Sequence, residues 1–287
     1  EYDNRVMCGE AWVLPLDRMA SWVRPDEYHQ TFNFGYMFAD WKKEAQRKSI
    51  NESLEAFGKV GAPSTWVFSN HDVIRHVSRF GMVNGVPQGD GIGPKGEQPD
   101  EAIGLRKGRA ATAFMLGLPG GAYLYQGEEL GLPEHTTLDG KYRQDPTWFR
   151  TKGKRVGRDG CRVPLPWEAG VGSANGFNQT GKAWIPQPEI YAEYSRDQQD
   201  GFEGSTLEMY KHALKLRKEL GLGHGSFDWV PEYTNDSALG YRNGDVLVIH
   251  NFGSNPIELP AGKVIASSRN GVSVELEPNQ TVWLQTN

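Results

Sequence analysis

Cysteine is scarce in this chain of 287 residues, which contains only Cys8 and Cys161. Two cysteines cannot form the set of disulfides that holds small secreted domains together, so the fold must depend on a hydrophobic core. A cytoplasmic location is the simplest interpretation of this cysteine content. Cys8 lies in a short apolar segment, where we expect it to behave as a small buried hydrophobic residue.

Long apolar runs and basic clusters are also missing. No stretch stays apolar over the roughly 20 residues that a bilayer-spanning helix needs, so no membrane partner is expected. A net charge of −5 without a basic run argues against a nucleic-acid partner. The seven histidines are scattered, and no His/Cys cluster or Asp-x-Asp-x-Asp loop occurs. We therefore expect neither a metal nor another cofactor.

Strand-like and helix-like segments alternate through the first three quarters of the chain. Short β-branched or aromatic runs predict strands, and longer segments with helical periodicity predict helices. Asp100 and Ser205 precede two of these helices and are suitable N-caps. The expected strands lie at residues 5–8, 31–34, 65–68 and 121–125, and the helices at residues 40–57, 101–116 and 206–220.

The pattern changes near residue 225, after a long segment rich in Pro, Gly, Trp and Arg over residues 130–204. Short strands separated by turns then follow at residues 246–250, 272–276 and 281–284, a pattern typical of an antiparallel β-sandwich. We therefore predict a partial catalytic (β/α)8 barrel over residues 1–222 and a C-terminal β-sandwich domain over residues 223–287. Four strand–helix units make half of such a barrel.

Two carboxylates follow predicted strands. Glu10 comes after the strand at residues 5–8, and Asp72 follows the strand at residues 65–68. A β/α barrel places its chemistry at the carboxyl ends of its parallel strands. Cleavage of a glycosidic bond needs one acid to protonate the leaving oxygen and a carboxylate facing the developing oxocarbenium ion. The two residues are therefore candidates for that pair.

The segments around these carboxylates resemble glycoside hydrolase family 13, the α-amylase family. Residues 9–12 (GEAW) resemble its strand-five motif, and residues 70–72 (NHD) resemble its strand-seven motif. Further matches resemble its α-glucosidase and oligo-1,6-glucosidase group: residues 125–131 (YQGEELG), residues 158–167 (RDGCRVPLPW) and residues 181–186 (GKAWIP). The resemblance covers nearly the whole chain, in the right order.

This resemblance implies a role for each motif residue. Glu10 would be the general acid/base, and Asp72 would stabilise the transition state while it binds the sugar together with His71. Trp12 would form an apolar wall of the substrate site, beside the acid. Arg75 lies three residues after Asp72, so direct substrate contact and a simple ion pair with Asp72 or Glu128 are both open. Glu10 could also be a structural carboxylate, and Asp72 a helix N-cap.

One expected residue is missing. The family's nucleophilic aspartate follows an arginine by two positions at the end of strand four, and no segment here resembles that pattern. The chain therefore resembles the C-terminal half of the family's enzymes, with barrel strands five to eight. The resemblance implies part of a retaining α-glucosidase acting on short oligosaccharides, inactive alone. Its expected partners are the oligosaccharide and either the N-terminal half of the same enzyme or a second copy.

Three alternatives stay open. A glucosyl-transferring member of the same family, acting on sucrose or trehalose, would carry similar motifs. A non-catalytic module that binds sugar or protein is a different class, and it would predict eroded motifs, whereas Glu10, His71 and Asp72 are all present. The chain could also be a stable fragment of a longer gene product.

Overall fold

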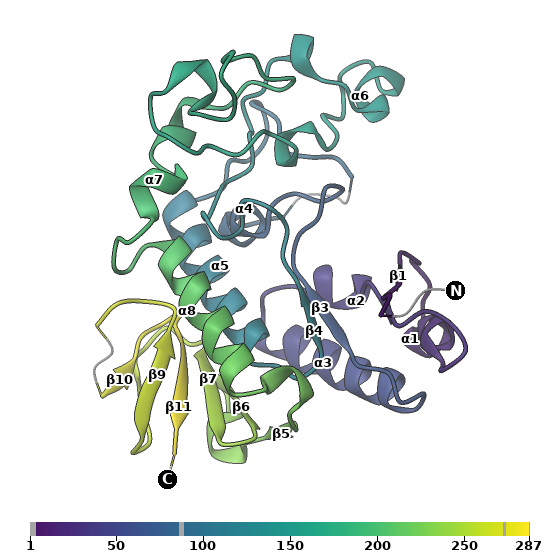
Figure 1. Cartoon of the computed structure of the whole chain (residues 1–287), viewed down its shortest axis with the longest axis vertical. Helices are drawn as coiled ribbons and strands as arrows, with labels where there is room; N and C mark the ends of the chain where they lie inside the picture. Colours follow the sequence, from purple (N-terminus) through teal and green to yellow (C-terminus); the bar gives the residue numbers. More distant parts are fainter. Residues whose placement is uncertain (1–3, 86–88, 272–273, 287) are drawn as a thin grey trace.

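Two pairs of short parallel strands occur in a computed structural model that describes residues 4–85, 89–271 and 274–286 (Figure 1). Strand β1 (Cys8–Gly9) pairs with β2 (Gln30–Thr31), and β3 (Thr65–Val67) pairs with β4 (Gly121–Tyr123). The Thr65 hydroxyl joins the two pairs by donating to the Thr31 carbonyl at 2.5 Å. Because the pairs are parallel, β1 and β2 end at one edge, as do β3 and β4.

Helices separate these strands, as the alternating pattern predicts. Asp100 accepts a hydrogen bond from the Ile103 amide at 2.9 Å, and Ser205 accepts one from the Glu208 amide at 3.2 Å, so both predicted caps are confirmed. The helices are α1 (Leu16–Ala20), α2 (Phe34–Met37), α3 (Lys43–Gly58), α4 (His76–Gly81), α5 (Glu101–Leu116), α6 (Pro146–Arg150), α7 (Arg196–Gln199) and α8 (Thr206–Glu219).

Helix α4 is not among the predicted helices, and two glycines in α5 explain how it packs. A Cβ atom at Gly104 would lie 2.1 Å from the Val77 carbonyl, and one at Gly108 would lie 2.5 Å from a Val77 methyl group. A glycine inside a helix costs about 0.5–1 kcal/mol relative to alanine. Here it lets α4 approach α5 closely, which keeps the segment after Asp72 against the body of the protein.

The segment over residues 130–204 contains small elements of its own, as expected for a loop of this length. It forms the upper part of the molecule in Figure 1 and has its own small apolar core around Leu132, Val163 and Tyr191. Besides α6 and α7 it holds short 3-10 turns at Gly140–Tyr142, Asp159–Cys161, Gly172–Ala174 and Glu189–Ala192. Others lie at Ser21–Val23, Leu222–His224 and Pro231–Tyr233.

The C-terminal part is antiparallel, as predicted. Five strands lie in the order β5-β6-β7-β11-β9, and β8 pairs with β10 beside them. The second layer is therefore a two-stranded ribbon rather than a full sheet. The bounds are β5 (Asp228–Trp229), β6 (Ala238–Asn243), β7 (Val246–Asn251), β8 (Ile257–Glu258), β9 (Lys263–Ser267), β10 (Glu275–Leu276) and β11 (Thr281–Gln285). Two positions of the predicted strand 272–276 lie outside the described residues.

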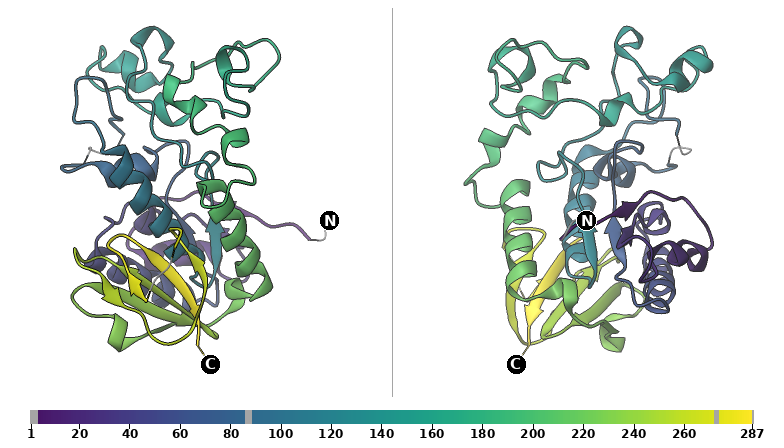
Figure 2. Two further views of the ribbon diagram at one scale, coloured as in Figure 1. Left: turned by 90° about the vertical axis from the view of Figure 1, so that its left-hand side faces the viewer. Right: turned by 45° about the vertical axis from the view of Figure 1, so that its right-hand side comes forward.

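The five-stranded sheet lies against helix α5 (Figure 2). Val248 and Trp283 share a buried core with Phe114 of α5, while the alternate residues Ile249 and Val282 face the ribbon. This alternation follows from the two-residue period of a strand. The hydrophobic core thus includes residues from both sides of the predicted domain boundary.

Side chains of this sheet also cap the end of α5. The last carbonyls of a helix have no partner within the helix. The Trp283 indole donates to the Ala113 carbonyl at 2.8 Å, and the Tyr241 hydroxyl donates to the Phe114 carbonyl at 2.5 Å. The Asn243 amide donates to the Gly117 carbonyl at 2.8 Å. These bonds fix the direction in which α5 leaves the sheet.

The N-terminal strand differs from its prediction. Only Cys8 and Gly9 form strand β1, and Val6 and Met7 are 71% and 50% exposed, so a buried strand over residues 5–8 is wrong. Cys8 is exposed as well, and Cys161 is buried. The reason is that, within the described ranges, β1 pairs with β2 and with no other strand.

No helix in the described part of the chain is both long and apolar enough to cross a membrane. A cytoplasmic location stays a prediction.

We predict that Tyr241→Phe lowers the free energy of unfolding by about 1–3 kcal/mol, because the buried Phe114 carbonyl loses its donor. Urea denaturation followed by circular dichroism measures this change. Tyr233→Phe is the matched control, since the Tyr233 hydroxyl makes no hydrogen bond to the described residues. Equal losses for the two variants would show that the cap does not contribute.

Candidate active site

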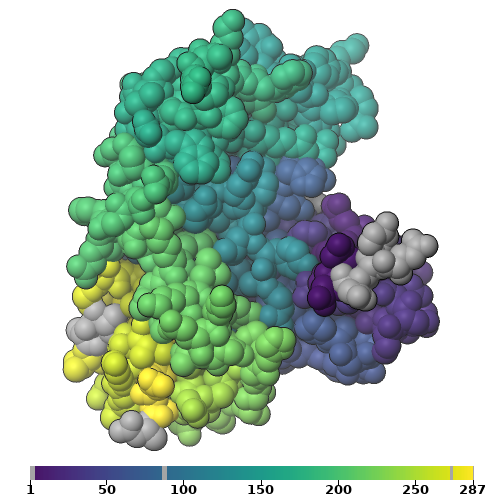
Figure 3. Space-filling model, viewed as in Figure 1, coloured from purple at the N-terminus to yellow at the C-terminus, as the bar shows by residue number. Residues whose placement is uncertain are grey.

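Three of the predicted site residues line one cavity. Glu10, Trp12 and Asp72 surround a cavity of about 360 Å³, together with Phe38 and Arg158. We call it the catalytic cavity. The surface is hollowed between the purple N-terminal residues and the teal residues above them (Figure 3). The fold thus brings together two carboxylates that are 62 positions apart in the sequence.

Two arginines hold the Asp72 carboxylate by a single oxygen. Arg158 Nη1 and Arg162 Nη2 each lie 2.7 Å from Asp72 Oδ1, and His71 Nε2 lies 3.5 Å from the same atom. No contact to Asp72 Oδ2 occurs among the described residues, so this oxygen can accept hydrogen bonds from a ligand. The helix N-cap alternative is wrong, because α4 begins at His76 with Arg75 in the cap position.

The resemblance over residues 158–167 assigned no role to these two arginines. Nothing in the local sequence of residues 158–162 (RDGCR) indicates which carboxylate Arg158 and Arg162 contact. Arg162 also donates from Nε to the His71 carbonyl at 2.7 Å, which ties the segment of the predicted sugar-binding residues to the long loop. His71 itself has a side chain that is 59% exposed, at the rim.

Aromatic rings form the wall beside Glu10. The Trp12 ring stacks on Phe34 and Phe38, with centroid distances of 5.2 and 4.9 Å, and half of its surface stays exposed. Such a ring can cover the apolar face of a sugar. Glu10 is exposed and makes no hydrogen bond or ion pair with the described residues. Its carboxyl group is therefore available to a substrate.

Arg75 lies behind the site. Its residue is 1% exposed, and its guanidinium donates to the Gln126 carbonyl at 2.8 Å and the Cys161 carbonyl at 3.0 Å. Its backbone amide donates to the Glu134 carboxylate at 3.0 Å. Direct substrate contact, one of the two predicted roles, does not fit this burial. The other, a direct ion pair with Asp72 or Glu128, is not among its contacts either.

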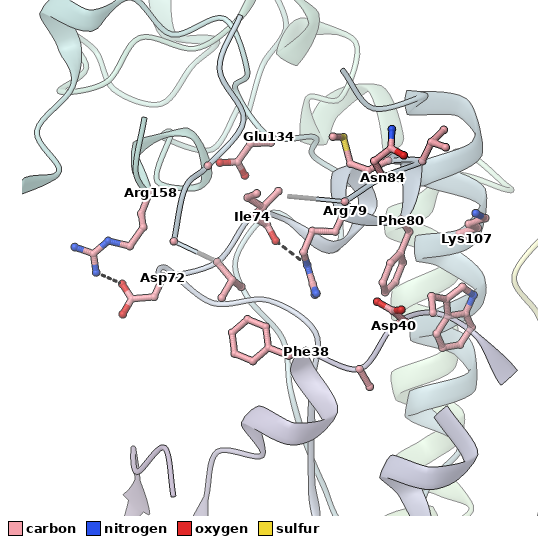
Figure 4. A pocket seen from close by; sticks show the side chains of 18 of the residues that line it. Phe38, Asp40, Asp72, Ile74, Arg79, Phe80, Asn84, Lys107, Glu134 and Arg158 are labelled. Carbon is pink, nitrogen blue, oxygen red and sulfur yellow. Dashed lines mark hydrogen bonds and ion pairs between the residues drawn. The ribbon is translucent and has the colours of Figure 1, made fainter. Parts of the chain in front are cut away.

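A second cavity of about 310 Å³ adjoins the first (Figure 4). The two share Asp72, Arg158 and Phe38, so a ligand in one touches the wall of the other. Arg79 lines the second cavity and donates to the carbonyls of Phe68, Met37 and Ile74. Its other charged lining residues are Asp40, Lys42, Lys107 and Glu134.

Two carboxyl groups of this region are buried: Glu134 lines the second cavity, and Glu128 lines neither cavity. Burial raises the pKa of Glu128 to about 8 and that of Glu134 to about 7, although hydrogen bonds from the Tyr125 and Arg75 amides oppose the shift. Burial lowers the pKa of His76 to about 3, so this ring is neutral at physiological pH. No group of three His, Cys, Asp or Glu side chains in the described part of the chain could hold a metal ion.

Comparison with known proteins identifies the family. Residues 1–224 match the family model described as "Alpha amylase, catalytic domain". This chain belongs to the α-amylase family. It is 30% identical over 219 residues to a probable alpha-glucosidase of Rhizobium meliloti, and 26% identical over 235 residues to an oligo-1,6-glucosidase of Parageobacillus thermoglucosidasius.

A solved structure has a similar fold. The structure of the alpha-glucosyl transfer enzyme XgtA matches with a TM-score of 0.77 at 26% identity, over 99% of this chain and 51% of that one. The two curated relatives are matched over 75% and 74% of this chain, but over only 35% and 36% of their own lengths. The chain thus spans about a third of those relatives and half of the XgtA chain.

We predict that Glu128→Gln increases stability more at pH 9 than at pH 5. The pKa of Glu128 is about 8 in the folded protein and about 4.5 in the unfolded chain, so its protonation stabilises the fold fully below about pH 4.5. This stabilisation is lost as the pH rises through 8. Removing the carboxyl group should therefore raise the free energy of unfolding by roughly 1–3 kcal/mol more at pH 9 than at pH 5. Urea midpoints at both pH values measure this, with the adjacent Glu129→Gln as control. A pH-independent effect would contradict the prediction.

Proposed function

We propose that this chain is the part of a retaining α-glucosidase that carries the general acid/base and the transition-state stabiliser. The main observation that supports this proposal is that Glu10 and Asp72 line the same cavity. Glu10 would protonate the leaving oxygen and later activate water, and Asp72 would bind the sugar through its free Oδ2. The names of the two curated relatives support α-glucosidic bonds of short oligosaccharides as the substrate.

The other predicted residues take supporting roles in this proposal. Trp12 would stack on the sugar and exclude water, while His71 would donate to a hydroxyl at the rim. Arg75 would act indirectly, by holding the segments that carry the site. The parallel strands β1 to β4 would be strands five to eight of a (β/α)8 barrel, with the catalytic part over residues 1–222 and the sandwich over residues 223–287.

The nucleophilic carboxylate would come from a polypeptide region outside these residues. A retaining mechanism needs a second carboxyl group about 5–5.5 Å from the acid/base, and no segment of this sequence resembles the family's nucleophile motif. The open edge of β1 and the exposed Val6 and Met7 beside it fit a polypeptide partner there. That partner would be the N-terminal half of the same enzyme or, alternatively, a second copy.

A glucosyl-transferring enzyme is the second candidate, favoured by the structural match to XgtA. Hydrolysis and transfer share the same first step and differ in whether water or a sugar attacks the intermediate. Chromatography of the products from maltose separates the two. Free glucose alone would support the hydrolase, and longer or rearranged oligosaccharides would support the transferase.

We predict that the 287-residue chain alone does not hydrolyse p-nitrophenyl α-glucoside, because the covalent step lacks its nucleophile. Co-expression with the N-terminal half of the same enzyme should restore turnover, measured by nitrophenol release. Turnover by the purified chain alone that is abolished by Glu10→Gln would contradict this prediction. Sedimentation of the same samples shows whether a partner or a second copy completes the assembly.

We predict that Glu10→Gln in the assembled enzyme lowers kcat/KM for maltose by about 10²–10⁴-fold, because the leaving sugar needs a proton. The loss on p-nitrophenyl α-glucoside should be much smaller, since nitrophenolate leaves without protonation. Glu27→Gln, which changes a surface carboxylate paired with Arg24, is the control. Equal losses on both substrates would remove the acid/base assignment.

A further inference from the structure

Asp145 is a buried carboxylate that the roles proposed above do not use. It is 1% exposed, and its Oδ2 accepts hydrogen bonds from Arg158 Nε at 2.5 Å and from the Arg158 amide at 3.0 Å. Its Oδ1 accepts from the Thr147 amide at 2.8 Å. Although burial opposes it, these bonds hold the pKa of Asp145 well below its usual range, so the group is ionised. Asp145 is therefore a buried negative charge directly behind Arg158.

The other end of the same guanidinium reaches the catalytic cavity. Arg158 bridges Asp145 and Asp72, while Arg162 contacts Asp72 alone of these two carboxylates. The group of four thus contains two positive and two negative charges. Without Asp145, the Asp72 carboxylate would face two guanidinium groups with a net positive charge.

The loop around Asp145 allows this placement. A Cβ atom at Gly157 would lie 2.7 Å from Asp145 Cγ, and Gly157 has a φ of +72°. Only glycine is compatible with both features without strain. The Asp159 carboxylate accepts from the Gln144 and Asp145 amides at 3.1 Å each, which holds the backbone of the loop.

Charge balance matters because the transition state of glycoside cleavage is a cation. An oxocarbenium ion beside Asp72 is repelled by an uncompensated positive charge, and this repulsion is strong in a partly buried cavity. Sharing Arg158 between two carboxylates keeps it in place and cancels its charge. Asp72 then retains an oxygen and a negative charge for the sugar.

We propose that Asp145 is a positioning residue of the active site, which anchors Arg158 and neutralises it so that Asp72 can stabilise a cationic sugar. This inference rests on the proposed function, because it requires that the catalytic cavity binds a glucosyl group. It adds a residue outside the cavity lining and assigns it an electrostatic effect that can be measured separately from folding.

The test compares a cationic and a neutral probe by ligand-observed NMR titration of the assembled enzyme, which is the 287-residue chain together with its N-terminal half. The probes are a protonated piperidine iminosugar of glucose configuration and glucose itself. Asp145→Asn keeps the shape and removes the charge, so the affinity for the iminosugar should fall about tenfold, with glucose changing much less. Asp159→Asn is the matched control, because it removes a buried carboxylate of the same loop that contacts neither Arg158 nor Arg162 through a side-chain ion pair.

A second variant separates charge from structure. Asp145→Asn combined with Arg158→Gln leaves one guanidinium and one carboxylate, so the ratio of the two affinities should return toward the wild-type value. Two results would overturn the assignment of Asp145 while leaving the sugar site intact. One is an equal loss of affinity for both probes, which leaves the ratio of the two affinities unchanged. The other is no recovery of that ratio in the double variant. If the assembled wild-type enzyme binds neither probe, or binds both with affinities that Trp12→Ala leaves unchanged, the proposed function itself fails.

Discussion

The candidate active site depends on one buried cation, Arg75. Its guanidinium is closed off from solvent and must find acceptors, because an unpaired buried charge costs several kcal/mol. It finds them in the carbonyls of Gln126 and Cys161, while its amide binds the Glu134 carboxylate. Gln126 follows strand β4, and Cys161 lies between Arg158 and Arg162. Arg75 thus joins the three segments that carry the site.

This constraint explains why the long loop meets Asp72 so closely. Once Cys161 is held by Arg75, the arginines on either side of it project toward the segment after β3. Both then contact the same oxygen of Asp72. A carboxylate held through one oxygen keeps the other for a ligand, which suits the role proposed for Asp72 in binding a sugar and opposing a positive charge. The buried Asp145 reduces the net positive charge that Arg158 and Arg162 place beside Asp72.

Helix α5 connects the site region to the antiparallel sheet. Its first turn is capped by Asp100, its middle lies close to α4 through Gly104 and Gly108, and its last carbonyls bind Tyr241 and Trp283. Each feature restricts the position of the helix along or around its axis. The C-terminal sheet therefore contributes to the site indirectly, by holding the helix against which the segment after Asp72 packs.

Local patterns in the sequence determined much of this protein. The apolar runs predicted strand β3, and the N-caps Asp100 and Ser205 marked where α5 and α8 begin. The carboxylates after two strands, with their flanking motifs, indicated the family and the cavity residues Glu10, Trp12 and Asp72. Tertiary structure decided the rest. Asp72 meets Arg158 across 86 positions, Arg75 is enclosed by segments that follow it by 51 and 86 positions, and Cys8 is exposed. These outcomes depend on which distant segments cover a residue, and a local pattern of hydrophobicity or capping carries no information about that.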